Sequence, residues 1–302
     1  MITVFGSINV DFVTRVDHIP AAGETVLGPD YQVFAGGKGG NQALAAARAG
    51  ANVRMIGAVG DDPFAAIGTA QLALADVDLK GLARHSAPTG AAFIAVSAEG
   101  ENAIVVASGA NRLANASQIE TLAFGKSDLL LVQRELDDTQ TCKAMAHAKA
   151  QGARVILNAA PAHGMTADWL SCLDILILNE GEIADLGQIL SLPETDPDAL
   201  AQHIAHQAGI TVIVTLGPDG CIGWSDGIRR ALPALPVSVV DTTAAGDSFC
   251  GAFAAALDQG LGLTGALQHG IAAGSLACET LGAQSSIPDR QAIKTALAGQ
   301  FV

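Results

Sequence analysis

Residues 239–257 read VVDTTAAGDSFCGAFAAAL and pass from the end of a strand, through a bare turn, into a helix of small residues. Strand, turn and helix in this order form the repeating unit of α/β folds. The turn TTAAGD carries a single carboxylate, Asp247, where the helix begins. A helix N-terminus offers unpaired N–H groups and the positive end of the helix dipole. Asp247 can therefore be a simple helix cap or a base beside an anion-binding site, and the turn alone favours neither role.

Short strand-like runs alternate with alanine-rich helical runs over most of the chain. The strands are expected at 2–8, 52–60, 128–133, 153–160, 174–179, 211–217 and 237–240. The helices are expected at 40–50, 63–77, 137–152, 180–190, 198–208, 247–259 and 263–281. Strands that alternate with helices predict a parallel sheet covered by helices on both faces.

Two segments, at about 10–35 and 89–108, interrupt this alternation without a helical pattern of their own. We predict that they pair into a small separate sheet, which forms a lid over the edge of the main sheet. The chain has no linker, repeat or low-complexity tract, so residues 1–302 are expected to form one domain with this lid. Exposed lid strands invite pairing with a second copy, and we therefore expect a homodimer joined through the lids.

The composition indicates a globular protein. Half of the 302 residues are hydrophobic and 15% are charged, which supports a large core. The net charge of −14 disfavours nucleic acids and anionic membranes as partners, while an anionic small molecule could still bind in a local pocket. Five scattered cysteines without a CxxC pair indicate reduced thiols. With no signal peptide and no apolar run of about 20 residues, a soluble cytoplasmic protein is expected.

Polar residues follow the expected strands at six points. In an open α/β sheet, ligands bind outside the carboxyl ends of the strands. For any single residue, a role as a turn-former or helix cap explains the pattern equally well. The argument for a ligand site therefore rests on six strand ends placing polar groups at one edge. The residues concerned are Asn9, Asp11, Gln133, Glu135, Asn158, Asn179, Glu182, Thr215, Gly217 and the stretch 241–247.

A second motif, AGGKGGNQA at 35–43, places four glycines around Lys38, with Asn41 at the start of a helix. Glycine lets a backbone approach a ligand closely, although a flexible surface loop would have a similar composition. The motif is neither the P-loop GxxxxGK[ST] nor the dinucleotide fingerprint GxGxxG after a main-sheet strand. It indicates a ligand loop without naming the ligand.

Together, AGGKGGNQA and DTTAAGDSF resemble the two signatures of the PfkB carbohydrate kinase family, and ribokinase-type members are the most similar. The resemblance covers essentially the whole chain, through GSINVD, PAAGETV, GDDPF, PTGAAFI, EGENAIVVASGAN, NAAPA, LNEGE, TLGPDG and GAQSSIP in family order. It implies a ribokinase-like three-layer α/β sandwich with a mostly parallel central sheet and a small β-sheet lid. It also implies ATP-dependent phosphorylation of a primary hydroxyl, most simply of D-ribose to D-ribose 5-phosphate.

The resemblance assigns roles to residues of both motifs. Asp247 matches the catalytic base, which accepts the proton of the attacking hydroxyl, and Ala244, Ala245 and Gly246 match an anion hole. Such amides can stabilise the charge of a phosphoryl group in transfer. Mixed donors and acceptors suit the hydroxyls of a sugar. The positions that match sugar contacts are Asn9, Asp11, Gly37, Lys38, Asn41, Glu135 and Asp247.

The resemblance also implies ATP, Mg²⁺ and a monovalent cation of the K⁺ type as cofactors. Mg²⁺ prefers few protein carboxylates and several waters, which suits one glutamate acting through water. The nucleotide and its magnesium would be met by Asn179, Glu182, Thr215, Gly217, Gly220 and Gly246. The cation site maps to Asp241, Thr243, Ala277, Thr280, Gly282 and Ser286.

Three positions depart from the usual family pattern. NAAPA replaces NPAPA, Ile271 stands where many relatives place a polar residue near the adenine, and Arg134 is inserted before Glu135. We expect Arg134 to face away from the sugar. The alternatives within the family are a kinase for another sugar or for a nucleoside. Outside it, a non-catalytic sugar or nucleotide sensor and an NAD-dependent oxidoreductase remain, although the intact AAGD run and the missing fingerprint glycines disfavour them.

Overall fold

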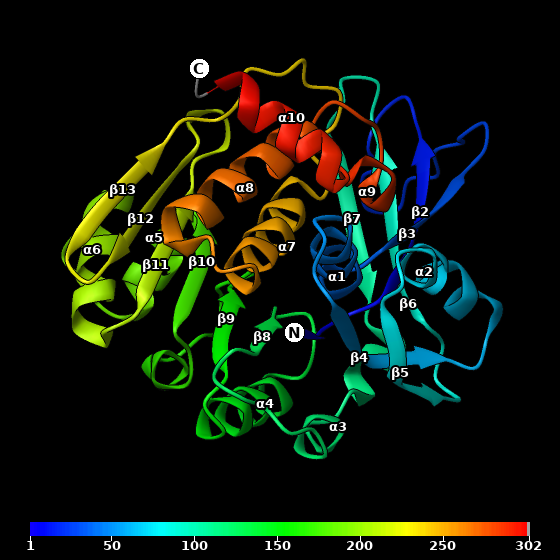
Figure 1. Ribbon diagram of the computed structural model, residues 1–302. Helices are drawn as coiled ribbons and strands as arrows, with labels where there is room; N and C mark the ends of the chain where they lie inside the picture. The colour runs from blue at the N-terminus through cyan, green and yellow to red at the C-terminus, as the bar shows by residue number, and fades with distance from the viewer. Residues whose placement is uncertain (301–302) are drawn as a thin grey trace.

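The computed structural model describes residues 1–300, so residues 301 and 302 of the expected single domain lie outside the described part. Its centre is a nine-stranded sheet (Figure 1). The strands are β1 (Ile2–Phe5), β4 (Val53–Gly60), β5 (Asp78–His85), β8 (Leu129–Val132), β9 (Arg154–Asn158), β10 (Ile175–Asn179), β11 (Thr211–Thr215), β12 (Cys221–Ser225) and β13 (Ile228–Leu232). Their order is β13-β12-β11-β10-β9-β8-β1-β4-β5. All pairings from β11 to β5 are parallel, and β12 and β13 add an antiparallel edge.

Helices cover both faces of this sheet (Figure 1). Burial alternates along the strands accordingly: Ile2 and Val4 pack into one core cluster, and Phe5 packs into the other. One layer contains α1 (Lys38–Arg48), α2 (Pro63–Leu74), α7 (Ala245–Asp258), α8 (Gly262–Ala277), α9 (Ala283–Ser286) and α10 (Arg290–Gln300). The other contains α3 (Ser117–Glu120), α4 (Asp138–Ala150), α5 (Glu180–Ile189) and α6 (Pro197–Ala208). This arrangement is the three-layer sandwich that the sequence predicts.

The two segments that interrupt the α/β alternation form a second, four-stranded sheet of order β3-β2-β6-β7. Its strands are β2 (Asn9–Arg15), β3 (Gln32–Gly36), β6 (Gly90–Val96) and β7 (Asn102–Ala107). Phe12 pairs in register with Val33 and Phe93, and Phe93 pairs with Val105, so these four side chains form one row, here called the outer row. Because successive residues of a strand point to opposite faces, Asp11 lies on the other face of the same strand.

The structure differs from the sequence prediction at the sheet edges. Strands β5, β12 and β13 are not among the strands expected from the sequence. For β5 and β13 the reason is that they are largely half-exposed and lack the apolar runs of the central strands. The expected strand at 237–240 is absent: Pro233 and Pro236 remove two backbone donors before it. Instead, the Leu235 N–H donates to Ser275 Oγ at 3.1 Å. This segment therefore lies against the end of α8 and does not pair with the sheet.

Two helices begin earlier than expected, and both starts lie in the sequence motifs. Helix α1 begins at Lys38 after Gly37, whose φ of 86° favours glycine, and not near Asn41. Helix α7 begins at Ala245 after Ala244, which adopts the left-handed conformation with φ 59°. Left-handed backbone costs a non-glycine residue of the order of 1–2 kcal/mol, so the surrounding structure must hold this turn in place.

The polar residues that end the parallel strands lie at one edge of the sheet. Asn158 and Asn179 are the last residues of β9 and β10, and Thr215 ends β11. The N-termini of α1 and α7 reach this edge, because Asn41 in the first turn of α1 bonds to Asp247 in the first turn of α7. Among the described residues, no helix is long and apolar enough to cross a membrane.

Candidate active site

Asp247 is held by two amide side chains from α1. Asn41 Nδ2 donates to Asp247 Oδ2, and Gln42 Nε2 donates to Asp247 Oδ1, each at 2.9 Å. The carboxylate is 7% exposed, so these bonds form in a largely dehydrated place. Hydrogen bonds to a charged group are shorter and stronger than neutral ones. The two motifs of the sequence, 206 residues apart at Asn41 and Asp247, therefore meet in one site.

Glu135 holds the first turn of α1 in place. Its Oε2 accepts the backbone N–H of Lys38 at 3.0 Å and the hydroxyl of Ser7. Helix α1 has no side-chain cap at Gly37, so this carboxylate satisfies an amide that would otherwise lack a partner, at the positive end of the helix dipole. Glu135 thus has a structural task in addition to any contact with a ligand.

The small sheet contributes Asn9 and Asp11 to the site. Asn111 Nδ2 donates to Asn9 Oδ1 at 2.7 Å, which leaves the amide group of Asn9 as a donor. Asn111 is itself fixed, because its Oδ1 accepts the Ile8 N–H at 3.0 Å. The carboxylate of Asp11 lies against Gly36, where an added Cβ would come within 2.2 Å of Oδ2. Gly36 must therefore be glycine for Asp11 to occupy this place.

Three carboxyl groups and one ammonium group share the site, and the pKa values of Asp11 and Lys38 are shifted by their neighbours. Burial, and then the nearby carboxylates of Glu135 and Asp247, raise the pKa of Asp11 to about 7. The carboxylate of Asp247 is the largest cause that raises the pKa of Lys38, with further contributions from Glu135 and Glu182, and together they exceed the opposing effect of burial. Lys38 is therefore a firmly charged ammonium group surrounded by carboxylates.

The turn before Asp247 is only partly open. The Ala245 N–H donates to Thr242 O at 3.2 Å, so one of the three amides expected in the anion hole already has a partner. Ala244 caps the helix in its left-handed conformation. Gly246 is exposed, and an added Cβ would meet no atom within 4 Å. The open part of the turn is thus centred on Gly246.

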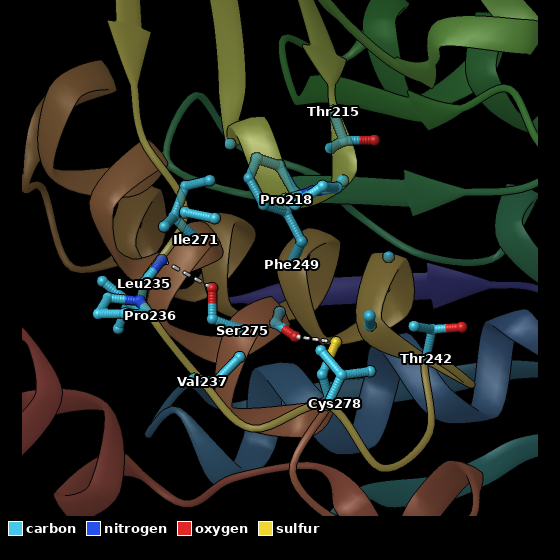
Figure 2. Close-up of a pocket in the computed structure, with 17 residues that line it drawn as sticks. Thr215, Pro218, Leu235, Pro236, Val237, Thr242, Phe249, Ile271, Ser275 and Cys278 are labelled. Carbon is cyan, nitrogen blue, oxygen red and sulfur yellow. Dashed lines mark hydrogen bonds between the residues drawn. The ribbon is translucent and has the colours of Figure 1, made fainter.

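A cavity of about 640 Å³ lies beside this turn, between β11 and helices α7 and α8 (Figure 2). Thr215, Gly217, Gly220 and Gly246, four of the expected nucleotide residues, line it. Figure 2 shows Phe249 and Ile271 in its wall, where both give the cavity an apolar contact. A cavity lined by apolar side chains and by glycines, one of them next to Asp247, suits a flat base joined to phosphates.

Asn179 and Glu182 do not line this cavity, and they form the capping box of α5. Glu182 Oε2 accepts the Asn179 N–H at 2.9 Å, and Asn179 Oδ1 accepts the Glu182 N–H at 2.8 Å. Burial is the largest influence on Glu182 and raises its pKa, while Lys38 acts in the opposite direction. Glu182 therefore lies within electrostatic reach of the Lys38 ammonium.

The residues expected at a cation site lie on two loops that Asp241 joins. Asp241 Oδ2 accepts the Gly282 N–H at 2.8 Å, and Oδ1 accepts the N–H and hydroxyl of Thr243. Burial favours a raised pKa, but these hydrogen bonds outweigh it and lower the pKa of Asp241. Ala277 ends α8, Thr280 lies in the turn that follows it, and Ser286 ends α9, so all three lie on the chain around Gly282. An ionised carboxylate and a loop rich in carbonyl oxygens suit a large monovalent cation.

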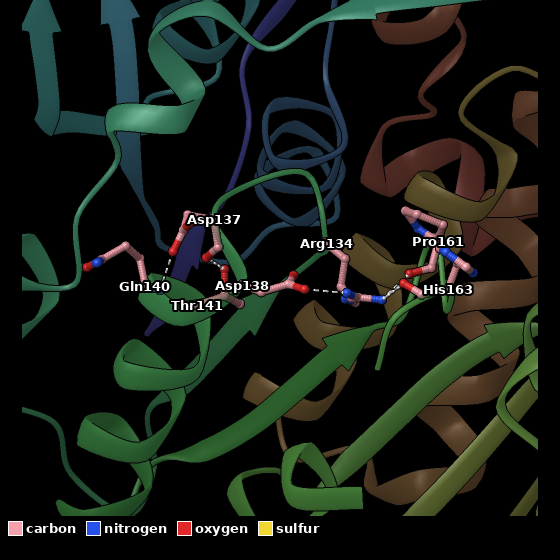
Figure 3. A network of polar contacts seen from close by, with 7 residues as sticks. All are labelled: Arg134, Asp137, Asp138, Gln140, Thr141, Pro161 and His163. Atoms are coloured by element: carbon pink, nitrogen blue, oxygen red, sulfur yellow. Dashed lines mark hydrogen bonds and ion pairs between the residues drawn. The ribbon is translucent and has the colours of Figure 1, made fainter. Parts of the chain in front are cut away.

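Figure 3 shows that the Arg134 side chain reaches toward Asp138 on one side and toward Pro161 and His163 on the other. Its guanidinium donates to Pro161 O at 2.9 Å and to His163 O at 2.6 Å, and it pairs with Asp138. It also lies 4.8 Å from the ring centre of Trp169. Arg134 thus fixes the loop that follows β9 and takes no part in the cluster around Lys38.

Several contacts of this site are not apparent from the sequence. Ser7, Gln42 and Asn111 each bond to an expected site residue, and although all three lie within the quoted motifs, the sequence alone indicates no role for their side chains. Gln133 and Asn158 follow strands as predicted, but their bonds go to Gln42. A glutamine in the otherwise apolar run after Asn41 is the one signal that could have suggested a buried polar contact.

The arrangement suits transfer of a charged group to a hydroxyl. It combines a buried carboxylate that can accept a proton, a lysine that can neutralise negative charge, a helix N-terminus and a cavity of about 640 Å³. In phosphoryl transfer, positioning and charge neutralisation account for most of the catalysis.

Comparison with known proteins gives the same class. Residues 1–290 match the PfkB family of carbohydrate kinases. The chain is 38% identical to the ribokinase of Haemophilus influenzae over 294 residues, which cover 96% of each chain. The ribokinase structure from Thermotoga maritima matches with a TM-score of 0.91 and 35% identity over 98% of this chain and 99% of that one. A structure of Arabidopsis thaliana ribokinase complexed with ribose and ATP matches with a TM-score of 0.86 and 29% identity over 100% and 99%.

The fold and the site thus define a sugar kinase, and the chain belongs to the PfkB family of carbohydrate kinases. Within that family it is a ribokinase-type kinase. The predicted family and fold are confirmed, including the small second sheet.

The raised pKa of Asp11 predicts a pH-dependent stability. The folded-state value of about 7 lies above the ordinary value of 3.8, so the folded protein binds the extra proton, and the free energy of unfolding falls as pH rises between these values. Asparagine mimics the neutral acid. The stability advantage of Asp11→Asn over wild type should grow by roughly 2 kcal/mol between pH 5 and pH 8. Urea denaturation at both pH values measures it.

The exposed Asp17 provides the matched control, since Asp17→Asn removes the same charge two residues beyond β2. An advantage of Asp11→Asn that does not change with pH would contradict the raised pKa.

Proposed function

We propose that the protein transfers the γ-phosphoryl group of ATP to the primary hydroxyl of D-ribose and forms D-ribose 5-phosphate. The observation that carries the proposal is the position of Asp247. Its buried carboxylate accepts hydrogen bonds from Asn41 and Gln42 of α1, and it directly follows Gly246, which lines the cavity. The choice of D-ribose rests on the ribokinases that resemble the full chain, one of which is described with ribose and ATP bound.

In this proposal the sugar lies between the small sheet and the N-terminus of α1. Asn9 offers a donor because Asn111 occupies its oxygen, while Asp11 and Glu135 offer carboxylate oxygens. Lys38, Gly37 and Asn41 complete the contacts from the first turn of α1. Unpaired buried partners would then disfavour a sugar that lacks one of the matching hydroxyls.

Asp247 then accepts the proton of the primary hydroxyl as the hydroxyl oxygen attacks the γ-phosphorus in line, and the bond from that phosphorus to the bridging oxygen breaks so that ADP leaves. The Lys38 ammonium lies within electrostatic reach of Asp247, and the open amide of Gly246 directly precedes Asp247, which supports their roles in stabilising the negative charge that develops. Closure of the small sheet over the sugar would exclude water and so suppress ATP hydrolysis.

Two metal ions belong to the proposal. Bound Mg²⁺ neutralises charge on the ATP phosphates, and Glu182 would hold it through water. This fits the described residues, among which no cluster of three or more His, Cys, Asp and Glu side chains could form a protein-only site. A K⁺-type cation would be held by the loops that Asp241 joins, through oxygens of Asp241, Thr243, Ala277, Thr280, Gly282 and Ser286. The five cysteines are free thiols, which supports the cytoplasm as the place of action.

We also propose a homodimer in which the outer rows of two lids pack together. Val105 and Phe93 are 67% and 51% exposed, and the ring of Phe12 stacks on Phe93 at 5.5 Å. A contiguous apolar row across four strands is an unusual surface for a monomer. A second copy offers the matching surface by two-fold symmetry.

D-ribose should be the best substrate in a panel of pentoses, ketoses and nucleosides assayed by ATP consumption. Replacing sodium with potassium should raise the rate with D-ribose several-fold, because the cation orders the loop beside the turn of Gly246. Faster turnover of a nucleoside or another sugar would refute the choice of D-ribose, and equal rates in both salts would refute the K⁺ site.

Asp247→Asn should lower kcat for the best substrate by at least a thousandfold, because the amide cannot accept the proton. Binding of ATP, measured by titration calorimetry, should survive, since Asp247 does not line the nucleotide cavity. Substantial remaining activity would remove Asp247 from the role of base.

Phe93→Glu should convert a dimer into a monomer in light scattering, because it buries a charge in the proposed contact. Ile228→Lys is the control: Ile228 is 55% exposed on the edge strand β13, far along the chain from the small sheet. A wild-type monomer, or a dimer that Phe93→Glu leaves intact, would contradict this interface.

A further inference from the structure

Behind Asp247 lies a chain of three buried side-chain amides. Gln133 Nε2 donates to Gln42 Oε1 at 2.7 Å, and Gln42 Nε2 donates to Asp247 Oδ1 at 2.9 Å. The same Gln42 nitrogen donates to Asn158 Oδ1 at 3.0 Å. Gln42 is 0% exposed, Gln133 is 1% and Asn158 is 9%. A helix and the ends of two strands thus contribute one polar network to the core.

Each amide in this network can place its NH₂ group and its oxygen in only one way, because the carboxylate of Asp247 fixes the first amide and each amide fixes the next. An ionised carboxylate can only accept hydrogen bonds, so the NH₂ group of Gln42 must face Asp247. The oxygen of Gln42 then faces Gln133, which must donate. Asn158 accepts from Gln42 and turns its own NH₂ group to Ile177 O at 3.3 Å. A flip of any one amide would place two donors or two acceptors face to face.

Gln42 acts on the carboxylate and has no access to a ligand. It lines neither the nucleotide cavity nor the 410 Å³ cavity beneath the small sheet, whereas its neighbour Asn41 has an assigned sugar role. Asn41 and Gln42 each bond to a different oxygen of Asp247, and two such bonds fix the plane of the carboxylate. Both donors are neutral amides, so they position the carboxylate without adding a charge beside it.

We propose that Gln42 is a positioning residue, which sets the orientation of the Asp247 carboxylate and is itself held in place by its hydrogen bonds to Gln133 and Asn158. The proposal rests on the proposed function, in which Asp247 is the base. It goes beyond that function because it assigns the reactivity of Asp247 to residues that no substrate touches. A purely structural Gln42 would affect folding, but it would leave the pH dependence of turnover unchanged.

The test compares Gln42→Met and Gln42→Glu with wild type, by kcat, KM for the best sugar and the pH dependence of kcat. Gln42→Met removes the donor, so kcat should fall about ten- to hundredfold, as for the loss of one hydrogen bond to a charged group, while KM changes less than about threefold. Gln42→Glu places a second carboxyl against Asp247 Oδ1. The pair must then share a proton, so the acid limb of the kcat profile should move to higher pH by at least about one unit.

Gln118→Met is the matched control, because Gln118 also donates two hydrogen bonds, to Gly57 O and Gly81 O, away from the site. It should lower stability in urea without changing kcat or its pH profile. Gln133→Met provides a second route should the Gln42 variants fail to fold: it removes the donor that holds Gln42 Oε1, so Gln42 holds Asp247 less rigidly and kcat should fall several-fold at unchanged KM.

A kcat within twofold of wild type and an unmoved acid limb in the folded Gln42 variants would overturn the proposal. If those variants do not fold, an unchanged kcat in Gln133→Met would overturn it equally. The parallel assay of Asp247→Asn distinguishes a failure of the proposed function from a failure of the proposed role of Gln42. An active Asp247→Asn refutes the proposed base, whereas an inactive Asp247→Asn beside normal Gln42 and Gln133 variants refutes only the role of Gln42.

Discussion

The close packing of α1 against α7 is the constraint on which the site depends. At Gly251 of α7 an added Cβ would lie 2.5 Å from Ala45 Cβ and 2.5 Å from Gln42 O, so the two helices touch backbone to backbone. Only glycine allows that approach. The small residues of both helices are therefore a requirement of the chemistry as much as of the core. They bring the first turns close enough for Asn41 and Gln42 to reach Asp247 directly.

The electrostatic character of the site follows from the same approach. Asp11, Glu135 and Asp247 are brought together in a place with little water, and one lysine ammonium lies among them. The pKa of Asp11 rises to about 7, because this carboxyl group is buried and lies near the carboxylates of Glu135 and Asp247. The others are stabilised by hydrogen bonds from α1.

Much of this fold could be predicted from the sequence, because the central strands are continuous apolar runs between alanine-rich helices. The edge strands β5 and β13 could not, since half-exposed strands carry no such run, and residues 237–240 look like a strand although two preceding prolines prevent it. At the site, the motifs indicate the chemistry of Lys38 and Asp247. Gln42 and Asn111 also lie within quoted motifs, but their roles could not be predicted, because they arise from contacts between segments far apart in the sequence.

Side chains along β2 point alternately to the two faces of the small sheet, and this constrains how the sequence can change in evolution. Asp11 and Phe12 are neighbours in one strand, yet the first faces the catalytic side and the second belongs to the outer row. Inserting a single residue ahead of them would exchange the two faces, whereas a point substitution changes one face and leaves the other intact. Sugar preference and surface character can therefore drift independently by replacement, but an odd-numbered change in length would alter both at once.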